Sequence, residues 1–258
     1  GDHGYLVPHK HYTSYKSKMV RFDINNFTSS GVTVMDVSAA ANNPSLAGFV
    51  SGFAGDGYGY LVPDHTAPSG LYQTDDTTES NVVRFPTTEK ITSLDLSLAK
   101  ADPDLTGFKG GFAHDNSGYL IPGGNGKVVE FSTSGFSANN VNVIDFSILT
   151  GDASLVEFSG GFKDKTHGYL IPETFNKVAQ FDLATAKIIS SLDISVNGKD
   201  VSGFSGGFIS GDYGYLIPNK SNELVRFSTN QDNTIIHNSD DKFTLDSFKS
   251  EDMITIDK

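Results

Sequence analysis

Short segments in which apolar and polar residues alternate recur along the whole chain. Val20 and Phe22 flank the charged Arg21, and the same alternation returns at residues 128–131. A period of two places the apolar side chains on one face, as in a half-buried β-strand. No segment longer than a single turn has the period of a helix. The pattern therefore predicts an all-β protein.

The alternating segments belong to a repeat. The phrase Gly-Tyr-Leu-(Val or Ile)-Pro occurs five times, beginning at Gly4, Gly59, Gly118, Gly168 and Gly214. We name the predicted strands of each repeat in order. Strand A is the Gly-Phe phrase that precedes this repeated phrase, and strand B is its Tyr-Leu-Ile-Pro part. Strand C is the segment of the Val-Arg-Phe type, and strand D is the segment of the Leu-Asp-Leu-Ser type. Four short strands over about 40 to 50 residues are typical of a β-propeller blade.

These repeats predict one β-propeller domain over residues 1–258, with five blades of four antiparallel strands. The repeat units lie at about 1–47, 48–106, 107–156, 157–202 and 203–258. Glycine inside a strand usually marks the close approach of another backbone. We therefore expect the glycine-rich strand A to be the innermost strand of each blade.

The ends of the chain leave the closure of the predicted ring open. The chain starts in strand B of the first repeat, so there are five B, five C and five D strands but four A strands. Either the missing strand lies outside this chain, which is then a piece of a longer array, or residues 253–258 complete the first blade. In the first case residues 253–258 are the fifth strand D, and in the second case residues 242–248 are. The stretch from Thr229 to Asp252 is predicted to be irregular.

Composition narrows the function classes. The net charge is −12 and no cluster of Lys and Arg appears, which argues against a nucleic-acid partner. No apolar run reaches the roughly 18 to 20 residues that span a bilayer, so membrane insertion is not expected. The chain has no cysteine, which removes disulfides and thiolate sites. We predict no cofactor and no metal.

One apparent catalytic motif is interpreted as architecture. Gly203, Ser205 and Gly207 match Gly-x-Ser-x-Gly, the pattern of a hydrolase nucleophile. At the position of Ser205 the other repeats carry Val50, Lys109 and Ser159. A catalytic serine is needed only once, yet the phrase around it recurs. We therefore predict that Ser205 is inert and that the protein is not an enzyme.

Repeated aspartates are interpreted in the same way. Between strands A and B each repeat that can be compared has an acid, and strand D carries another. Because Asp bonds the backbone two residues on, turn chemistry is the favoured interpretation of the first set over calcium ligands. The residues are Asp56, Asp115, Asp164 and Asp212 in the A–B turns, and Asp36, Asp95, Asp145 and Asp193 in strand D.

The connections between strands B and C differ most between repeats. They are long in the first two repeats, at residues 9–18 and 64–80, and short in the other three. Loops on a rigid scaffold carry much of protein function, so this face is the predicted binding surface. Its candidate binding residues are His9, His11, Tyr12, Tyr15, Asp64, His65 and Tyr72. A polar surface loop, a metal site of imidazole and carboxylate, and a sugar site with stacking tyrosines all fit.

From Gly4 to Phe227 the phrases resemble those of a family of tandem-repeat proteins secreted by, or on the surface of, algae, stramenopiles and other protists. The resemblance implies a non-catalytic, extracellular structural or interaction module. Its partners would be other protein chains of an extracellular assembly, or glycans. A carbohydrate-binding lectin is the alternative, and a five-bladed glycoside-processing enzyme the second alternative, which needs a pair of carboxylates. No functional residue is carried over from the family.

Overall fold

A computed structural model describes residues 2–8, 17–44, 46–63, 80–86, 90–146, 155–195, 200–220, 223–230 and 235–237. The chain divides into two compact units. Unit 1 is Gly1–Asp145 and unit 2 is Phe146–Lys258. Each unit is a set of antiparallel sheets, so the prediction of an all-β fold is confirmed. No helix of the described residues is long and apolar enough to cross a membrane.

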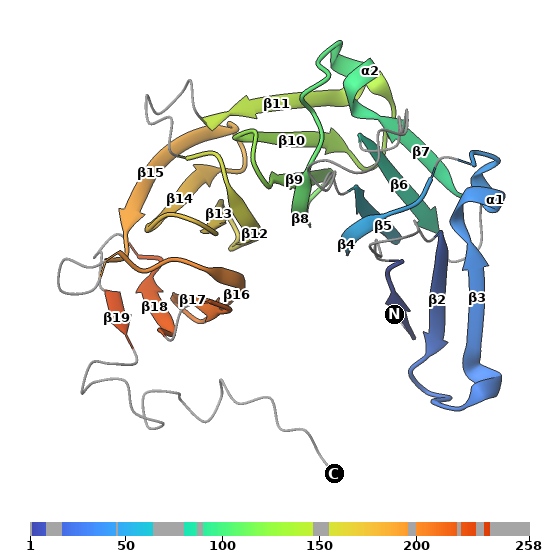
Figure 1. Cartoon of the computed structure of the whole chain (residues 1–258), viewed down its shortest axis with the longest axis horizontal. Coiled ribbons are helices and arrows are strands. Elements are labelled where there is room, and N and C mark those ends of the chain that lie inside the picture. The colour runs from blue at the N-terminus through green and yellow to red at the C-terminus, as the bar shows by residue number, and fades with distance from the viewer. Residues whose placement is uncertain are drawn as a thin grey trace, which may run out of the picture. The chain divides into compact units, whose positions relative to one another are not determined.

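Unit 1 holds three sheets (Figure 1). Sheet 1 has three strands, and sheets 2 and 3 have four each. Sheet 1 is β1 (His3–Leu6), β2 (Lys18–Asp23) and β3 (Val32–Asp36); sheet 2 is β4 (Phe49–Gly55), β5 (Tyr58–Pro63), β6 (Asn81–Pro86) and β7 (Thr92–Asp95); sheet 3 is β8 (Phe108–His114), β9 (Ser117–Pro122), β10 (Lys127–Ser132) and β11 (Val141–Asp145).

Unit 2 holds two sheets of four strands. Sheet 4 is β12 (Phe158–Lys163), β13 (His167–Pro172), β14 (Lys177–Asp182) and β15 (Lys187–Asp193); sheet 5 is β16 (Phe204–Ser210), β17 (Tyr213–Pro218), β18 (Val225–Ser228) and β19 (Ile235–His237). In all five sheets the strands lie side by side in chain order. Strand A forms one edge of sheets 2 to 5, while in sheet 1 that edge is strand B, as the repeat count predicts.

The recurring Gly of strand B and Phe of strand C are neighbours across each sheet. Gly118 is paired with Phe131, and the ring of Phe131 covers the glycine so closely that a Cβ there would overlap it. The pairs Gly4–Phe22, Gly59–Phe85 and Gly214–Phe227 repeat the arrangement. Only glycine leaves room for the ring, which explains why the two phrases recur together.

Strand A carries a β-bulge at the same place in every copy. The register shifts between Phe204 and Gly206, so Ser205 has no partner across the sheet. The same shift falls on the equivalents of Ser205 in the other three copies, at Val50, Lys109 and Ser159. An unpaired bulge residue is not constrained by a cross-strand neighbour. This explains why four positions in one phrase hold three residue types.

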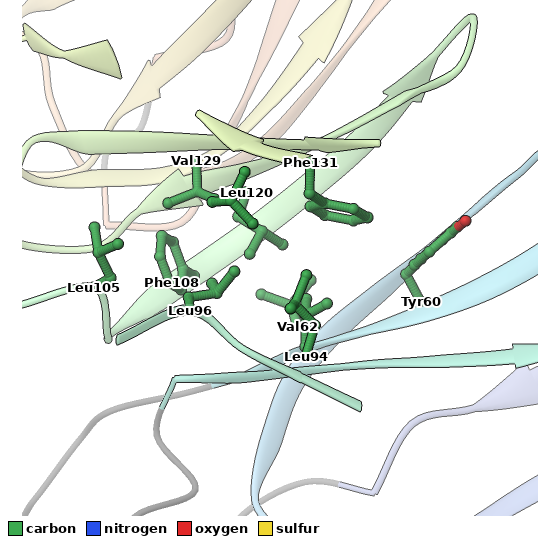
Figure 2. Packing of buried hydrophobic residues seen from close by; sticks show 11 residues of the cluster. Tyr60, Val62, Leu94, Leu96, Leu105, Phe108, Leu120, Val129 and Phe131 are labelled. Atoms are coloured by element: carbon green, nitrogen blue, oxygen red, sulfur yellow. The ribbon is translucent and has the colours of Figure 1, made fainter. Parts of the chain in front are cut away.

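The cores lie between consecutive sheets of each unit. Figure 2 shows side chains of sheets 2 and 3 in one cluster, including Val62 and Leu94 from sheet 2 and Leu120 and Phe131 from sheet 3. A second cluster joins sheets 1 and 2 around Leu61. A third joins sheets 4 and 5. The apolar faces of the alternating strands are thus buried between sheets, as in stacked layers.

Two of the strand-D aspartates start short helices. Asp36 caps α1 (Val37–Ala41), and Asp95 caps α2 (Leu96–Lys100). The Asp95 carboxylate accepts hydrogen bonds from the backbone N–H of Leu98 at 3.1 Å and from two serine hydroxyls. Although burial raises the pKa of Asp95, these bonds together hold it below its ordinary value. The structural interpretation of these residues is therefore confirmed.

One prediction about the chain's last part is wrong. Residues from Thr229 to Asp252 were expected to be irregular, but β19 at Ile235–His237 pairs with β18 and is the fourth strand of sheet 5. The strand escapes pattern analysis because three residues are too few to show an alternation. Residues 242–248 and 253–258, the two expected strands near the end of the chain, lie outside the described residues.

Candidate functional site

The predicted binding residues on the two long connections lie outside the described residues. They are His9, His11, Tyr12, Tyr15, Asp64, His65 and Tyr72. The predicted binding face is therefore neither confirmed nor contradicted. Within the part of the chain that is described, no cluster of His, Cys, Asp or Glu is arranged to hold a metal ion.

A cavity of unit 1 lies between sheets 1 and 2. It has a volume of about 710 Å³, which is within the range of small-molecule sites. Its walls come from the N-terminal residues and β1 on one side, and from the β4–β5 hairpin and β6 on the other. The lining residues are Asp2, His3, Tyr5, Val7, Gly52, Phe53, Ala54, Gly55, Asp56, Gly57, Tyr58, Gly59, Tyr60, Leu61 and Phe85.

On the sheet 2 side of the cavity, two residues of β4 have small side chains or none. Gly52 and Ala54 stand two apart on β4, so their side chains would share one face. A Cβ on Gly52 would lie 2.8 Å from the carbonyl oxygen of Tyr60 and 3.1 Å from a methyl group of Val7. Gly52 is therefore fixed by close contacts to sheet 1 and to its own sheet. Around Gly52 the cavity is therefore bordered by backbone atoms and by a methyl group of Val7.

The sheet 1 wall presents an aromatic ring. Tyr5 lies with its ring centroid 5.1 Å from that of Phe85, at an interplanar angle of 56°. Tyr5 is the strand-B tyrosine of sheet 1, and Phe85 is the strand-C phenylalanine of sheet 2. The two rings come from neighbouring sheets and form the apolar end of the cavity.

In the four-stranded sheets, which include a strand A, a third ring packs against the corresponding pair of tyrosine and phenylalanine. Between sheets 4 and 5, Tyr169 lies 5.8 Å from Phe227, and Phe162 of strand A stacks on Tyr169 at 5.4 Å and lies 6.2 Å from Phe227. Sheets 2 and 3 repeat this arrangement with Phe53, Tyr60 and Phe131. In sheet 1 no described strand A supplies the third ring. The cavity occupies the place that this ring fills elsewhere.

A glycine of the next sheet marks the same place. The Phe53 ring lies 2.5 Å from where a Cβ of Gly111 would be, and the Phe162 ring stands in the same relation to Gly207 at 2.6 Å. Gly52 is the corresponding glycine of sheet 2, since each of the three precedes the second Phe of its strand A. No aromatic ring is among the nearest atoms to it. The residues that contact the third ring in the other sheets therefore have counterparts on both sides of this cavity, namely the aromatic pair and Gly52.

Polar groups lie at the edge of the cavity. Asp2 is exposed and His3 is half-buried, and both lie on the sheet 1 side. Asp56 lies on the sheet 2 side with a φ of 50°, the left-handed conformation of a turn, and its carboxylate accepts a hydrogen bond from the Thr133 hydroxyl. Asp56 thus lies in the A–B turn as predicted, with its carboxylate bonded to Thr133; the predicted bond to the backbone two residues on is present at Asp164, which accepts from the N–H of Thr166 at 2.7 Å. Carboxylates on both sides give the entrance an acidic character.

Tyr60 carries a buried hydroxyl that has no hydrogen-bond partner among the described residues. Burial raises the pKa of this phenol to about 12, so it stays protonated at neutral pH. Figure 2 shows its oxygen pointing away from the other labelled side chains of the cluster. Tyr60 lines the cavity, and its ring also belongs to the cluster of sheets 2 and 3.

A smaller cavity in unit 2, of about 280 Å³, lies beside a polar network. The Tyr169 hydroxyl donates to Asp164 at 2.9 Å and accepts from the Gln180 amide at 3.3 Å. Ser190 donates to the Gln180 carbonyl at 2.9 Å. Since these polar groups have partners within the chain, they need no ligand. We therefore take the larger cavity of unit 1 as the candidate site.

Sequence reasoning missed His3, Tyr5 and Val7 as site residues. The signal was present, because the repeat count leaves strand B of the first repeat without a strand A. That observation was used only to ask how a ring closes. An unpaired strand edge next to two aromatic residues could also have been interpreted as a binding site.

Comparison with known proteins bears on the fold. No family model matches the chain, and no curated protein matches it. Among solved structures, virginiamycin B lyase from Staphylococcus aureus is similar at 10% identity with a TM-score of 0.59, covering 91% of this chain and 73% of the lyase. A catalytically inactive H270A form of that lyase with quinupristin aligns at 10% identity with a TM-score of 0.60, covering 92% and 70%. Hydrazine synthase from Kuenenia stuttgartiensis aligns at 9% identity with a TM-score of 0.54, covering 86% and 59%.

These likenesses show a propeller-like all-β fold. They also correct one expectation. A regular repeat without a unique catalytic motif was taken to indicate a non-catalytic structural module, yet an enzyme has the same fold over nine tenths of this chain. That inference is wrong because a repeated scaffold leaves its loops and sheet edges free to carry chemistry. At 10% identity the likeness carries no substrate to this chain.

Proposed function

We propose that this chain binds a ligand that carries an aromatic ring, and that the ligand lies in the cavity between sheets 1 and 2. The observation that carries the proposal is the pair Tyr5 and Phe85, two members of a three-ring cluster whose third ring is not supplied by any described residue. Aromatic rings at 4.5 to 7 Å attract one another beyond the area that they bury. On this proposal the five sheets are five blades of a β-propeller, and the site lies between two of them.

A fluorinated probe tests this proposal. N-acetyl-4-fluorophenylalanine amide is titrated with the full chain and followed by ¹⁹F NMR. We expect saturable broadening and a shift of the fluorine signal. The Ala54→Trp variant fills the cavity from the sheet 2 wall and should weaken binding at least tenfold. Leu98→Trp is the matched control, since Leu98 is 80% exposed on α2 and does not line the cavity. Equal binding by the Ala54→Trp variant would refute the location, and no binding by the unaltered chain would refute the proposal.

A second candidate function is acid–base catalysis on the bound ligand. His3 lines the cavity, and histidine is the side chain that most often transfers protons near neutral pH. The likeness to a lyase supports testing this on quinupristin, the compound named with one solved lyase structure. If the candidate is right, mass spectrometry detects a converted product with the unaltered chain and none with His3→Ala. Recovery of unchanged quinupristin after incubation with the unaltered chain would reject lyase activity on it.

A further inference from the structure

The free edge of β1 is the feature that extends the proposed function. The carbonyl of Asp2 accepts a hydrogen bond from the N–H of Ile24, on the β2 side. Backbone groups of an antiparallel strand alternate between its two sides. The N–H and C=O groups of Tyr5 therefore point away from β2, where sheet 1 has no further strand in the described chain. An unpaired edge of this kind is a template for another strand.

The other sheets show what pairs with this edge. In each of them the second Phe of strand A lies directly across from the strand-B tyrosine, as Phe53 does from Tyr60 and Phe162 from Tyr169. Stacking follows from this register, with centroid distances of 5.1 and 5.4 Å. A strand added to β1 in the same register would place its aromatic residue across from Tyr5, in the cavity. The free edge and the cavity are thus two parts of one site.

Charge indicates the second property of the incoming strand. Asp2 and Asp56 lie on opposite sides of the cavity, and the chain as a whole has a net charge of −12. The strand A of sheet 3 carries Lys109 and that of sheet 4 carries Lys163. A basic residue near the aromatic one would therefore meet an acidic entrance, and long-range attraction would favour such a segment over an acidic one.

From these observations we infer that the ligand is an extended segment of another protein chain, of the type Gly-Phe-Lys-Gly-Gly-Phe, which adds to β1 as a fourth strand of sheet 1. This inference rests on the proposed function and names its ligand class. Main-chain hydrogen bonds to β1 supply affinity, and the ring in the cavity supplies specificity.

A tryptophan peptide tests the inference, because the chain contains no tryptophan. The probe is acetyl-Gly-Phe-Lys-Gly-Gly-Trp-Ala-amide, the sequence of residues 107–113 with tryptophan at the second aromatic position. We expect a blue-shifted emission and higher anisotropy on titration with the full chain. N-methylation of the tryptophan amide removes the bond to the Tyr5 carbonyl and should weaken binding at least tenfold. Reversing the charge with Glu in place of Lys should weaken it about threefold.

The outcomes separate this inference from the proposed function. If N-acetyltryptophanamide and the N-methylated peptide bind as well as the parent peptide, the ring alone is recognised. The proposed function then stands and the inference is refuted. If neither peptide nor amino acid amide binds, both are refuted. If the peptide binds only after residues 238–258 are deleted, the occupant is this chain's own segment, and the inference of a partner chain is refuted. Tight peptide binding that is lost in Ala54→Phe and kept in Leu98→Phe, neither of which adds a tryptophan to the chain, supports it.

Discussion

Sheet 1 and sheet 4 are built from the same phrases and differ in one strand. Both have a strand-B tyrosine near a strand-C phenylalanine of the next sheet, Tyr5 with Phe85 and Tyr169 with Phe227. In sheet 4 the ring of Phe162 completes the cluster, and in sheet 1 a cavity lies there. Since the residue types are the same, the cavity goes with the lack of a strand A beside β1 among the described residues, and not with a specialised sequence.

The remaining parts of sheet 1 are those of a complete sheet. Gly4 lies under Phe22 as Gly118 lies under Phe131. Asp36 caps a short helix as Asp95 does. The difference between the two kinds of sheet is therefore local to the strand-A edge. Two kinds of substitution test whether the difference is confined to the strand-A edge. One removes the third ring from a four-stranded sheet, and the other alters features that sheet 1 shares with the four-stranded sheets.

The largest effect is expected from removing the third ring of a complete cluster. Phe162→Ala should lower the free energy of unfolding by about 3 to 4 kcal/mol, because a buried ring is lost and a cavity is left. Tyr5→Ala should cost about half as much or less, since Tyr5 already borders a cavity. Urea denaturation followed by tyrosine fluorescence measures both. Equal losses would mean that the cluster of sheet 1 is not less tightly packed.

A smaller effect is expected at the glycine under the strand-C ring. Gly118→Ala would force its methyl group into the ring of Phe131 and should cost about 1 to 3 kcal/mol, the range of overpacked cores. Gly124→Ala is the control, because a Cβ at Gly124 meets no atom within 4 Å. That variant should be neutral or slightly stabilising. The same urea titration compares them, and a neutral Gly118→Ala would contradict the packing argument.

The helix caps should behave alike in both kinds of sheet. Removing the carboxylate with Asp95→Ala should cost about 1 kcal/mol at neutral pH, as caps do. Hydrogen bonds hold the pKa of Asp95 below its ordinary 3.8 despite burial, so the stabilisation is complete above that value and disappears as the pH falls through the lowered pKa. Asp36 also has a lowered pKa, through bonds from Ser38, Ser17 and Ala39. Thermal melts from pH 7 to pH 2 should show the same profile for Asp36→Ala.

The smallest effect is expected at the bulge of strand A. Ser205 is exposed and unpaired in β16, so Ser205→Ala should change stability by less than about 0.5 kcal/mol. Labelling with a fluorophosphonate probe should be unaffected by the substitution. A label that disappears in Ser205→Ala would show that the serine is a nucleophile, and would distinguish this bulge from those at Val50 and Lys109.

Much of the fold could be predicted from the repeated phrases, because strand period and glycine placement are local properties. The strands around Gly118 and Phe131 lie where the pattern put them. β19 was missed since three residues carry no period. The bulge at Ser205 left only an indirect signal, namely the variety of residues at that position. For the candidate site the repeat count gave one signal, a strand B at Gly4 without a strand A before it, but the contact between Tyr5 and Phe85 could not be predicted, because these rings meet only when two sheets pack.

The functional predictions have different outcomes. The long connections at residues 9–18 and 64–80 were chosen because they break the repeat, and since their candidate residues lie outside the described part of the chain, that binding face stays a prediction. An extracellular location, a protist source and partners in a secreted assembly stay predictions. The inference from a regular repeat to a non-catalytic module was wrong, since an enzyme has a similar fold; that this chain is not an enzyme stays an untested prediction.

Every strand pair in the described sheets joins strands that are consecutive in the chain. Such pairing keeps the contacts between strands close in sequence, which favours fast folding. Four sheets can therefore form in first-order steps, at rates that do not depend on protein concentration. A strand added to β1 from another molecule would follow second-order kinetics instead. The rate of the last step in completing sheet 1 would then rise with the concentration of the partner chain. The occupancy of the β1 edge would therefore report that concentration.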